Sequence, residues 1–481
     1  MNVEKITLPD LSDDDNRTLG MLLDQLAQKI ERNRLRKAFY DMKRVGRLIG
    51  SVIPPQYFRL GIVLGWSGKA VDLLARRCNL DRFVWPDGDL DSLGLREVWE
   101  GNALRAEVSQ GTISSLIHST AFIVNTRGGD GEPPALIHFR DAMGATGQWN
   151  PRTRRLDNLL TITGWDAEER VTGLVLYLGG RTVTAERGQS GWSVDIQEHP
   201  WGVPAEPLPY RPRLDRPFGS SRITREVMNL QDQATRTLIR LEAHSDIYAI
   251  PDLWLLGADE SIFKNADGTL KQTWQVVMGR IKGVPDDEDA TAPRADVKQF
   301  PAASPEPHLA ALNAFAKMFA RATSLPDTAV SITDMSNPTS AEAYDASQHE
   351  LIAEAEGATD DWSPYLRRAL IRALAMANNV SQDNIPPEWG TIQPKWRDPR
   401  YLSRAAHADA GMKQLSAIPW LAETEVGLEL LGLDDQQIAR AMADRRRAEA
   451  QQRMTALAAA AQAARGDTDV AALEGSGGDG G

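Results

Sequence analysis

The sequence has almost no cysteine, since Cys78 is the single one among its 481 residues. One cysteine cannot form an intrachain disulfide or supply a cysteine cluster for a metal, so Cys78 is predicted to fill space on a helix. The seven histidines do not fall in HExxH or in any other ligand spacing. We therefore expect no metal site and no cofactor.

Catalytic signatures are missing as well. No GK[ST] motif follows the glycine-rich residues 128–131, which favour a hairpin turn over a phosphate-binding loop, and no GxSxG motif occurs. The paired acids Asp14-Asp15 and Asp360-Asp361 are adjacent, so on a helix their side chains point apart and cannot share a metal ion or a proton. A nucleic-acid-processing enzyme is therefore the least favoured function, and we expect that the protein is not an enzyme.

Positive charge is in deficit, because 54 Lys and Arg stand against 66 Asp and Glu and give a net charge of -12. Clusters of Lys and Arg bind phosphates, so this composition argues against a surface that grips nucleic acid. It is compatible with DNA that passes without binding. A long apolar run is also absent, and the N-terminus is acidic and polar where a signal peptide would be basic and then apolar. We expect a cytoplasm-like compartment and no membrane association.

The stretch around which the chain is organised is residues 220–246, which are predicted to form one long helix. Ser220 offers an N-cap, and no Pro or Gly follows before Pro251, so the helix should run for about seven turns, roughly 40 Å. Apolar or small residues recur every three or four positions on one stripe: Ile223, Val227, Leu230, Ala234, Leu238 and Leu241. We expect neighbours, including copies of the same chain, to cover this stripe, although an ordinary bundle helix fits the same pattern.

The remaining pattern predicts an α+β fold. Further helices are expected over residues 14–40, 67–78, 307–324, 341–379, 405–417, 424–431 and 434–464, with a kink near 357–364. A helix at 113–117 and a strand at 121–125 precede a set of short alternating runs, which are typical of a meandering antiparallel sheet. These runs cover residues 135–139, 159–163, 171–178, 182–185 and 192–196, and another strand-like run covers 273–278.

Two polar loops stand out. Residues 325–339 are rich in Ser, Thr, Asp and Asn and are long for a connection between helices, which indicates a functional loop. The acidic run Asp286, Asp287, Glu288 and Asp289 lacks the ligand spacing and central Gly of an EF-hand, so we interpret it as an exposed loop.

Several short stretches occur in an order and spacing that are specific as a set. They are Phe39-Tyr40-Asp41 with Ile53-Pro54-Pro55; Gly65-Trp66 with Ala70-Val71-Asp72; Thr153-Arg154-Arg155; His199-Pro200-Trp201-Gly202-Val203-Pro204; Phe218-Gly219-Ser220-Ser221; Leu312-Asn313-Ala314-Phe315-Ala316; and Asn337-Pro338-Thr339-Ser340-Ala341-Glu342-Ala343. In this order the chain resembles the phage portal proteins of long-tailed phages of actinobacteria, over nearly its whole length to about Arg447.

The resemblance implies an α+β portal fold with an α/β wing, long stem helices, a small α/β clip, a tunnel loop and a helical C-terminal crown. The implied parts are residues 1–219 as N-terminal helices and α/β wing, 220–246 as stem helix, 247–306 as clip, 307–324 as second stem helix, 325–339 as tunnel loop, 340–393 as long kinked wing helix, 394–465 as helical crown and 466–481 as a disordered tail.

The function implied by the resemblance is a ring of about twelve copies at one capsid vertex. DNA would enter through this ring during packaging and leave through it during ejection. The implied partners are the terminase large subunit, the head-to-tail connector, the major capsid and scaffolding proteins, and double-stranded DNA without sequence specificity. The implied location is the virion, after assembly in the cytoplasm of the bacterial host.

The resemblance also assigns site residues. The apolar stripe of the stem helix would line the subunit interface or the channel, and Asp286, Asp287, Glu288 and Asp289 would lie at the docking face of the clip. Each phosphate contact would add friction to moving DNA, so a loop without Lys or Arg suits a channel. The loop residues expected to face DNA are Thr328, Val330, Ile332, Asp334 and Asn337.

The alternative hypothesis is a coiled-coil scaffold for capsid assembly. A scaffold would not need the sheet-rich region predicted between residues 117 and 196, so that region distinguishes the two functions.

Overall fold

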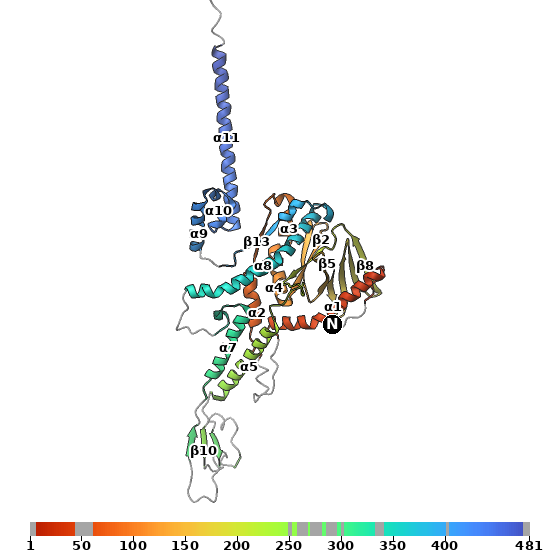
Figure 1. Ribbon diagram of the computed structural model, residues 1–481, viewed down its shortest axis with the longest axis vertical. Helices are drawn as coiled ribbons and strands as arrows, with labels where there is room; N and C mark the ends of the chain where they lie inside the picture. The colour runs from red at the N-terminus through yellow and green to blue at the C-terminus, as the bar shows by residue number, and fades with distance from the viewer. Residues whose placement is uncertain are drawn as a thin grey trace, which may run out of the picture. The chain divides into compact units, whose positions relative to one another are not determined.

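The computed structural model describes residues 6–43, 61–248, 253–256, 268–269, 281–284, 296–299, 303–331, 341–400 and 404–474 (Figure 1). The chain divides into two compact units, residues 1–399 and residues 400–481, and each is described by itself. None of the helices in these described ranges is long and apolar enough to cross a membrane.

The first long helix, α1, spans Asp13–Tyr40 and confirms the prediction for residues 14–40. Ser12 caps it, because its hydroxyl accepts a hydrogen bond from the backbone N–H of Asp15, and three acids in the first turn suit the positive end of the helix dipole. The apolar face of α1 is buried and consists of Leu19, Leu22, Leu23, Leu26 and Ile30.

This face of α1 packs on a five-stranded sheet. The strands are β4 (Ala145–Asn150), β5 (Arg155–Trp165), β6 (Val171–Leu178), β7 (Arg181–Gly188) and β8 (Gly191–Glu198). Their spatial order follows the chain and every pairing is antiparallel, so the predicted meander is confirmed for β5 to β8. Strand β4 was not predicted, and the run predicted at 135–139 belongs to another sheet. Leu160, Leu174, Leu176 and Val183 point from the sheet into one cluster with the leucines of α1.

A three-stranded antiparallel sheet lies next in the unit, in the order β3 (Ala135–Asp141), β2 (Thr120–Arg127), β9 (Ala205–Pro209). Residues 128–131 connect the antiparallel strands β2 and β3, and Gly131 has φ +83°, so the predicted hairpin turn is confirmed. The sheet packs against α4 (Leu104–His118) and α8 (Ala341–Ala377). The predicted helix and strand near 113–125 are thus confirmed, whereas β9 was not predicted.

Two strands from opposite ends of the sequence of this unit pair with each other. After α2 (Trp66–Ala75), strand β1 (Leu80–Val84) pairs antiparallel with β13 (Gln393–Trp396). Residues 394–399 were expected to be an extended link, and they are extended, with residues 394–396 forming part of β13. The segment belongs to the first unit because β1 takes it up as a second strand. The short helix α3 (Leu95–Gly101) lies between β1 and α4 and was not predicted.

The predicted long helix is α5, which spans Arg225–Tyr248 and begins later than expected. Residues 221 and 222 do not join it, because the Ser221 hydroxyl donates to the carbonyl oxygen of Ile117 and the Arg222 N–H donates to that of Leu116. Thr224 caps the helix instead of Ser220, since its hydroxyl accepts from the N–H of Val227 at 3.3 Å.

Helix α7 (Glu306–Thr323) confirms the helix predicted at 307–324 and packs along α5 (Figure 1). Below, α5 and α7 are together called the stem pair. Between the two helices, β10 (Leu253–Leu256) pairs parallel with β11 (Ile281–Val284) and antiparallel with β12 (Asp296–Gln299). The run predicted as a strand at 273–278 and the acidic run 286–289 lie outside the described residues.

Helix α8 confirms the long helix expected from residue 341, and Pro364 lies inside it. The kink expected near this proline stays a prediction. Trp362 of α8 is fully buried in the main core beside Tyr210 and Trp396. The helix therefore runs through the centre of the first unit.

The second unit is helical, as predicted, with α9 (Arg404–Ala417), α10 (Glu425–Leu430) and α11 (Asp435–Glu474). We expected a disordered tail from residue 466, but α11 continues to Glu474. A single Gly costs only about 1 kcal/mol in a helix, and good helix formers follow Gly466 at 471–474. Residues 475–481 lie outside the described part.

Candidate functional site

The apolar stripe of the stem is largely covered by the chain itself. Ile223, Val227 and Ala234 are at most 1 % exposed, and Leu230 is 8 % exposed. They belong to the main core, together with Leu312, Ala316 and Phe319 of α7.

These four residues are therefore not available to a neighbouring subunit. The expectation that the whole stripe faces neighbours is corrected for them, because α7 and the main unit already bury this side of α5. Leu238 and Leu241 are half-buried.

Helix α2 packs against both α5 and α7. The rings of Trp66 in α2 and Phe319 in α7 pack with centroids 5.3 Å apart. The buried side chain of Gln231 in α5 accepts a hydrogen bond from the backbone N–H of Ser67 at 2.8 Å. Helices α5 and α7 are thus held against α2 by apolar and polar contacts.

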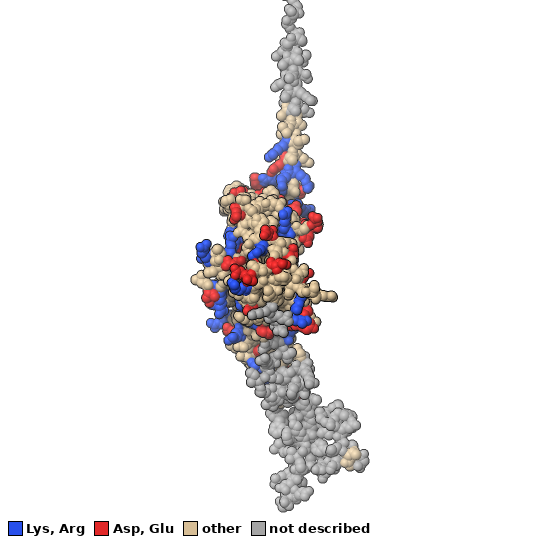
Figure 2. Space-filling model, turned by 90° about the vertical axis from the view of Figure 1, so that its right-hand side faces the viewer, with Lys and Arg blue, Asp and Glu red and all other residues tan. Residues whose placement is uncertain are grey.

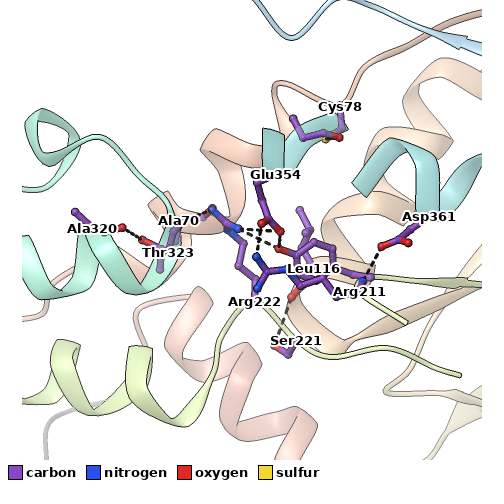
Figure 3. A network of polar contacts seen from close by, with 12 residues as sticks. Ala70, Cys78, Leu116, Arg211, Ser221, Arg222, Ala320, Thr323, Glu354 and Asp361 are labelled. Carbon is purple, nitrogen blue, oxygen red and sulfur yellow. Dashed lines mark hydrogen bonds and ion pairs between the residues drawn. The ribbon is translucent and has the colours of Figure 1, made fainter. Parts of the chain in front are cut away.

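Arg222, just before α5, joins four segments of the fold (Figure 3). Its Nε donates to the carbonyl oxygen of Ala70 at 2.7 Å, and its Nη2 donates to that of Thr323 at 2.5 Å. Its Nη1 donates to the hydroxyl of Tyr210 at 3.0 Å and lies 3.8 Å from a carboxylate oxygen of Glu354. The Arg222 side chain is 3 % exposed, so its charge is almost fully removed from water.

Glu354 of α8 compensates this buried charge. Its carboxylate accepts hydrogen bonds from the Tyr210 hydroxyl and from Arg211. Burial is the main cause that raises the pKa of Tyr210, so its hydroxyl stays protonated and can donate. A buried charge is tolerated when it is paired and hydrogen-bonded in this way. The network therefore forms a satisfied polar junction between the stem and α8.

Two further groups border the junction (Figure 3). The backbone N–H of Arg211 donates to Asp361 at 3.1 Å, yet burial, together with nearby Asp360 and Glu354, raises the pKa of Asp361 to about 6. Cys78 is buried with its Sγ 3.8 Å from the carbonyl oxygen of Ala355, and burial raises the pKa of its thiol to about 12. Cys78 is therefore an unreactive, space-filling residue, as expected, but it lies in the connection after α2 and not on a helix, because α2 ends at Ala75.

A second charge cluster anchors the three-stranded sheet to α8. Glu206 of β9 is 1 % exposed and binds Arg368 at 2.9 Å and Arg372 at 2.6 Å. Arg372 also donates to Asn125 of β2 at 3.2 Å. Sequence reasoning missed this cluster, because its members come from segments more than 160 residues apart and share no local motif.

The segment after α7 begins at this junction. Ser324 adopts a left-handed conformation with φ 51°, and the N–H of Leu325 donates to the carbonyl oxygen of Ala320. Leu325 is buried and Val330 is half-buried against the core, whereas Thr328 is exposed. Residues Ile332, Asp334 and Asn337 lie outside the described part of the chain, as do Asp286, Asp287, Glu288 and Asp289.

The chemistry of the junction is that of an anchor. The Arg222 network is satisfied within the protein, and among the described residues no group of three or more His, Cys, Asp or Glu could hold a metal ion. Its carbonyl, hydroxyl and carboxylate partners fix the ends of α5 and α7 on the first unit.

A family model of phage portal proteins, described as "Phage portal protein, SPP1 Gp6-like", matches residues 20–452 of the chain. The match spans both units and all the elements described from α4 through α10. The protein therefore belongs to the phage portal protein family, as the order of the short motifs suggested.

Two curated relatives carry the name "Portal protein". The one from Mycobacterium phage D29 is 27 % identical over 387 residues, with 78 % of this chain and 77 % of the relative covered. The one from Mycobacterium phage L5 is 26 % identical over 386 residues, with the same shares covered.

Among solved structures, a chain of the native gene transfer agent virion is 18 % identical, with 84 % of this chain and 99 % of the other covered and a TM-score of 0.38. A chain from the neck of the native gene transfer agent particle, computed with C12 symmetry, is 16 % identical, with 80 % and 95 % covered and a TM-score of 0.39.

Proposed function

We propose that the protein assembles head to tail into a closed ring at one capsid vertex, and that DNA enters and leaves the capsid through it. The family match over residues 20–452 is the observation that carries this proposal. About twelve copies is the expected number, and a heterologous interface that closes is what such a ring requires. The sheets of the first unit and the family match favour this function over a coiled-coil scaffold.

The exposed faces of the stem pair are the surfaces through which copies would meet. One side of α5 is covered by α7, so contact with a neighbour falls to the sides left open. Met318 on α7 is 46 % exposed. An apolar side chain at the centre of an interface contributes to binding when a partner covers it.

The DNA path would be bordered by the segment after α7. Its described part, residues 325–331, contains no Lys or Arg, and Asp327 and Thr328 are exposed. On the face shown in Figure 2, acidic and basic side chains are interspersed, with no large area of positive charge. Such a surface supports passage of DNA without tight binding.

The clip, residues 247–306, is the docking region in this proposal. The terminase large subunit would bind there during packaging, and the head-to-tail connector would replace it afterwards. The major capsid and scaffolding proteins would contact the ring at the vertex.

Sedimentation of the purified chain tests assembly. We expect a species whose mass is a multiple of the 52.9 kDa subunit, and we expect Met318→Asp to shift it toward the monomer. Met21→Asp is the matched control, because Met21 is 51 % exposed on α1. An unchanged ring in Met318→Asp would place the interface elsewhere, and a wild-type protein that is always monomeric would contradict the ring.

A further inference from the structure

A cavity of about 540 Å³ lies between α1, the segment that precedes α5, and the first turn of α5. Its lining contains five cationic side chains and one acid, Asp215. The cations are Lys29, Arg32 and Arg36 of α1, Arg216, and Arg225 of α5. Positions 29, 32 and 36 recur at helical spacing, so α1 presents three of the charges on one face.

Within the described residues, four of these five cations have no carboxylate partner. Among the described residues no carboxylate pairs with Lys29, Arg32 or Arg225, and Arg36 contacts only the carbonyl oxygen of His118 at 3.4 Å. Arg216 lies 3.8 Å from Asp215. This differs from other parts of α1, where Arg17 pairs with Asp14 at 2.7 Å.

Two of these cations, Lys29 and Arg36, have lowered pKa values. Burial lowers the pKa of Lys29, with a further decrease from Arg32. Burial, together with Arg32 and Arg216, also lowers the pKa of Arg36 to about 10. An anion in the cavity would relieve both the repulsion and the loss of hydration.

Two buried polar atoms in the lining have no hydrogen-bond partner within the described part of the chain. They are Oδ1 of Asn33 and Nδ1 of His118, and each residue is 3 % exposed. His118 also lines an adjacent cavity. Buried polar atoms are rarely left unpaired in native proteins, so these two point to a ligand.

The N-terminus of α5 also favours the binding of an anion in this cavity. Thr224 and Arg225 line the cavity at the N-terminus of this 24-residue helix, where the helix dipole and free N–H groups favour phosphate. The volume falls in the range of small-molecule sites, and a nucleotide is of suitable size.

We propose that this cavity binds a small phosphate-bearing polyanion of nucleotide size. Lys29, Arg32, Arg36 and Arg225 contact its phosphates. The site lies within one chain, so it needs no ring. A duplex is too wide for a cavity of this volume, and the unpaired buried atoms favour a small ligand over the acidic surface of a second copy.

Calorimetric titration of the full-length chain tests this proposal. The probes are inorganic tripolyphosphate and ATP, at constant ionic strength, with sodium chloride as the reference. We expect both probes to bind. Tighter binding of ATP would show that the nucleoside contributes, and equal binding would assign the affinity to the phosphates alone.

The variants replace two exposed cations of the lining, Arg32 and Arg225. Arg32→Gln and Arg225→Gln should each weaken binding about tenfold, because each removes a charge-assisted contact. Arg17→Gln is the control on the same helix, since its side chain is 70 % exposed and lies outside the lining. Circular dichroism confirms that the variants are folded.

Two results would overturn the proposal. The first is that neither probe binds to the wild-type chain, and the second is that Arg32→Gln and Arg225→Gln bind both probes as the wild type does. If neither probe binds and both variants also fail to form rings, the cavity is assigned to an acidic surface of a neighbouring copy.

Discussion

The guanidinium of Arg222 donates to the backbone carbonyl oxygen of Thr323 at 2.5 Å, and so links the start of one stem helix to the end of the other. Thr323 is the last residue of α7, where a cation also suits the negative end of the helix dipole. The same side chain is held by α2 and by Glu354 of α8. The buried Arg222 side chain therefore holds the ends of α5 and α7 against α2 and α8.

Replacing Arg222 by Met should lower the free energy of unfolding by roughly 3–5 kcal/mol, because the carbonyl oxygens of Ala70 and Thr323 lose their donor and Glu354 loses a buried partner. Urea unfolding followed by circular dichroism measures the change. Arg213→Met is the control, since Arg213 is exposed in its pair with Asp215 and should change stability by less than about 1 kcal/mol. Equal midpoints for the two variants would mean that the junction is not an anchor.

The carboxyl group of Asp361 should make stability depend on pH. Its pKa is raised to about 6 in the folded protein, against about 3.9 in an unfolded chain. Between these values the folded state binds more protons, so this group lowers stability as pH rises from about 4 to 6. Asp361→Asn should remove that contribution, and the variant should gain stability over the wild type at pH 7 but not at pH 4. A difference that is constant across this range would show that Asp361 titrates normally.

The acidic run of the clip should not contribute to ring formation. We expect the variant with Asp286, Asp287 and Asp289 changed to Asn and Glu288 changed to Gln to form rings as the wild type does, because the run is interpreted as an exposed loop. Native mass measurement compares the two assemblies. Loss of the ring would instead place these carboxylates in the subunit interface.

Lysine in the segment after α7 should slow the movement of DNA. We expect Thr328→Lys with Asp334→Lys to make packaging stall and become dependent on salt, because each new phosphate contact adds salt-dependent affinity. Val330 is a less suitable position, since its side chain packs on the core. Asp130→Lys, in the turn between β2 and β3, is the control with an added charge elsewhere. Packaging that is unaltered at low and high salt would mean that the segment does not face DNA.

Periodic patterns explain which parts of the fold could be predicted. Helix α1 and the meander β5 to β8 carry their signal in adjacent residues, with Leu19 to Ile30 on one helix face and alternation along each strand. The long helix at 220–246 could be predicted for the same reason, because its apolar residues recur every three or four positions. Its start was misplaced because Ser221 and Arg222 bond to Leu116 and Ile117, which lie a hundred residues earlier in the sequence.

Long-range pairings explain what could not be predicted. Strand β13 exists because Pro394 and Lys395 meet Phe83 and Arg82 of β1, and four residues with a proline give no local strand signal. The coverage of Ile223 and Val227 by the chain's own core depends on how α7 and the first unit fold around α5. The cationic cavity gathers Arg32 and Arg225 from two helices that are far apart in the sequence. The Arg-rich stretch 31–37 stands out in the sequence, but by itself it favours a solvated helix face over a phosphate patch.

Electron microscopy of the purified full-length chain tests the central claim most directly. Negative-stain images should show closed rings, each with a central hole, and rotational averaging should give the number of subunits. Discrete monomers in all buffers and at all concentrations would contradict the ring, and with it the proposed channel for DNA.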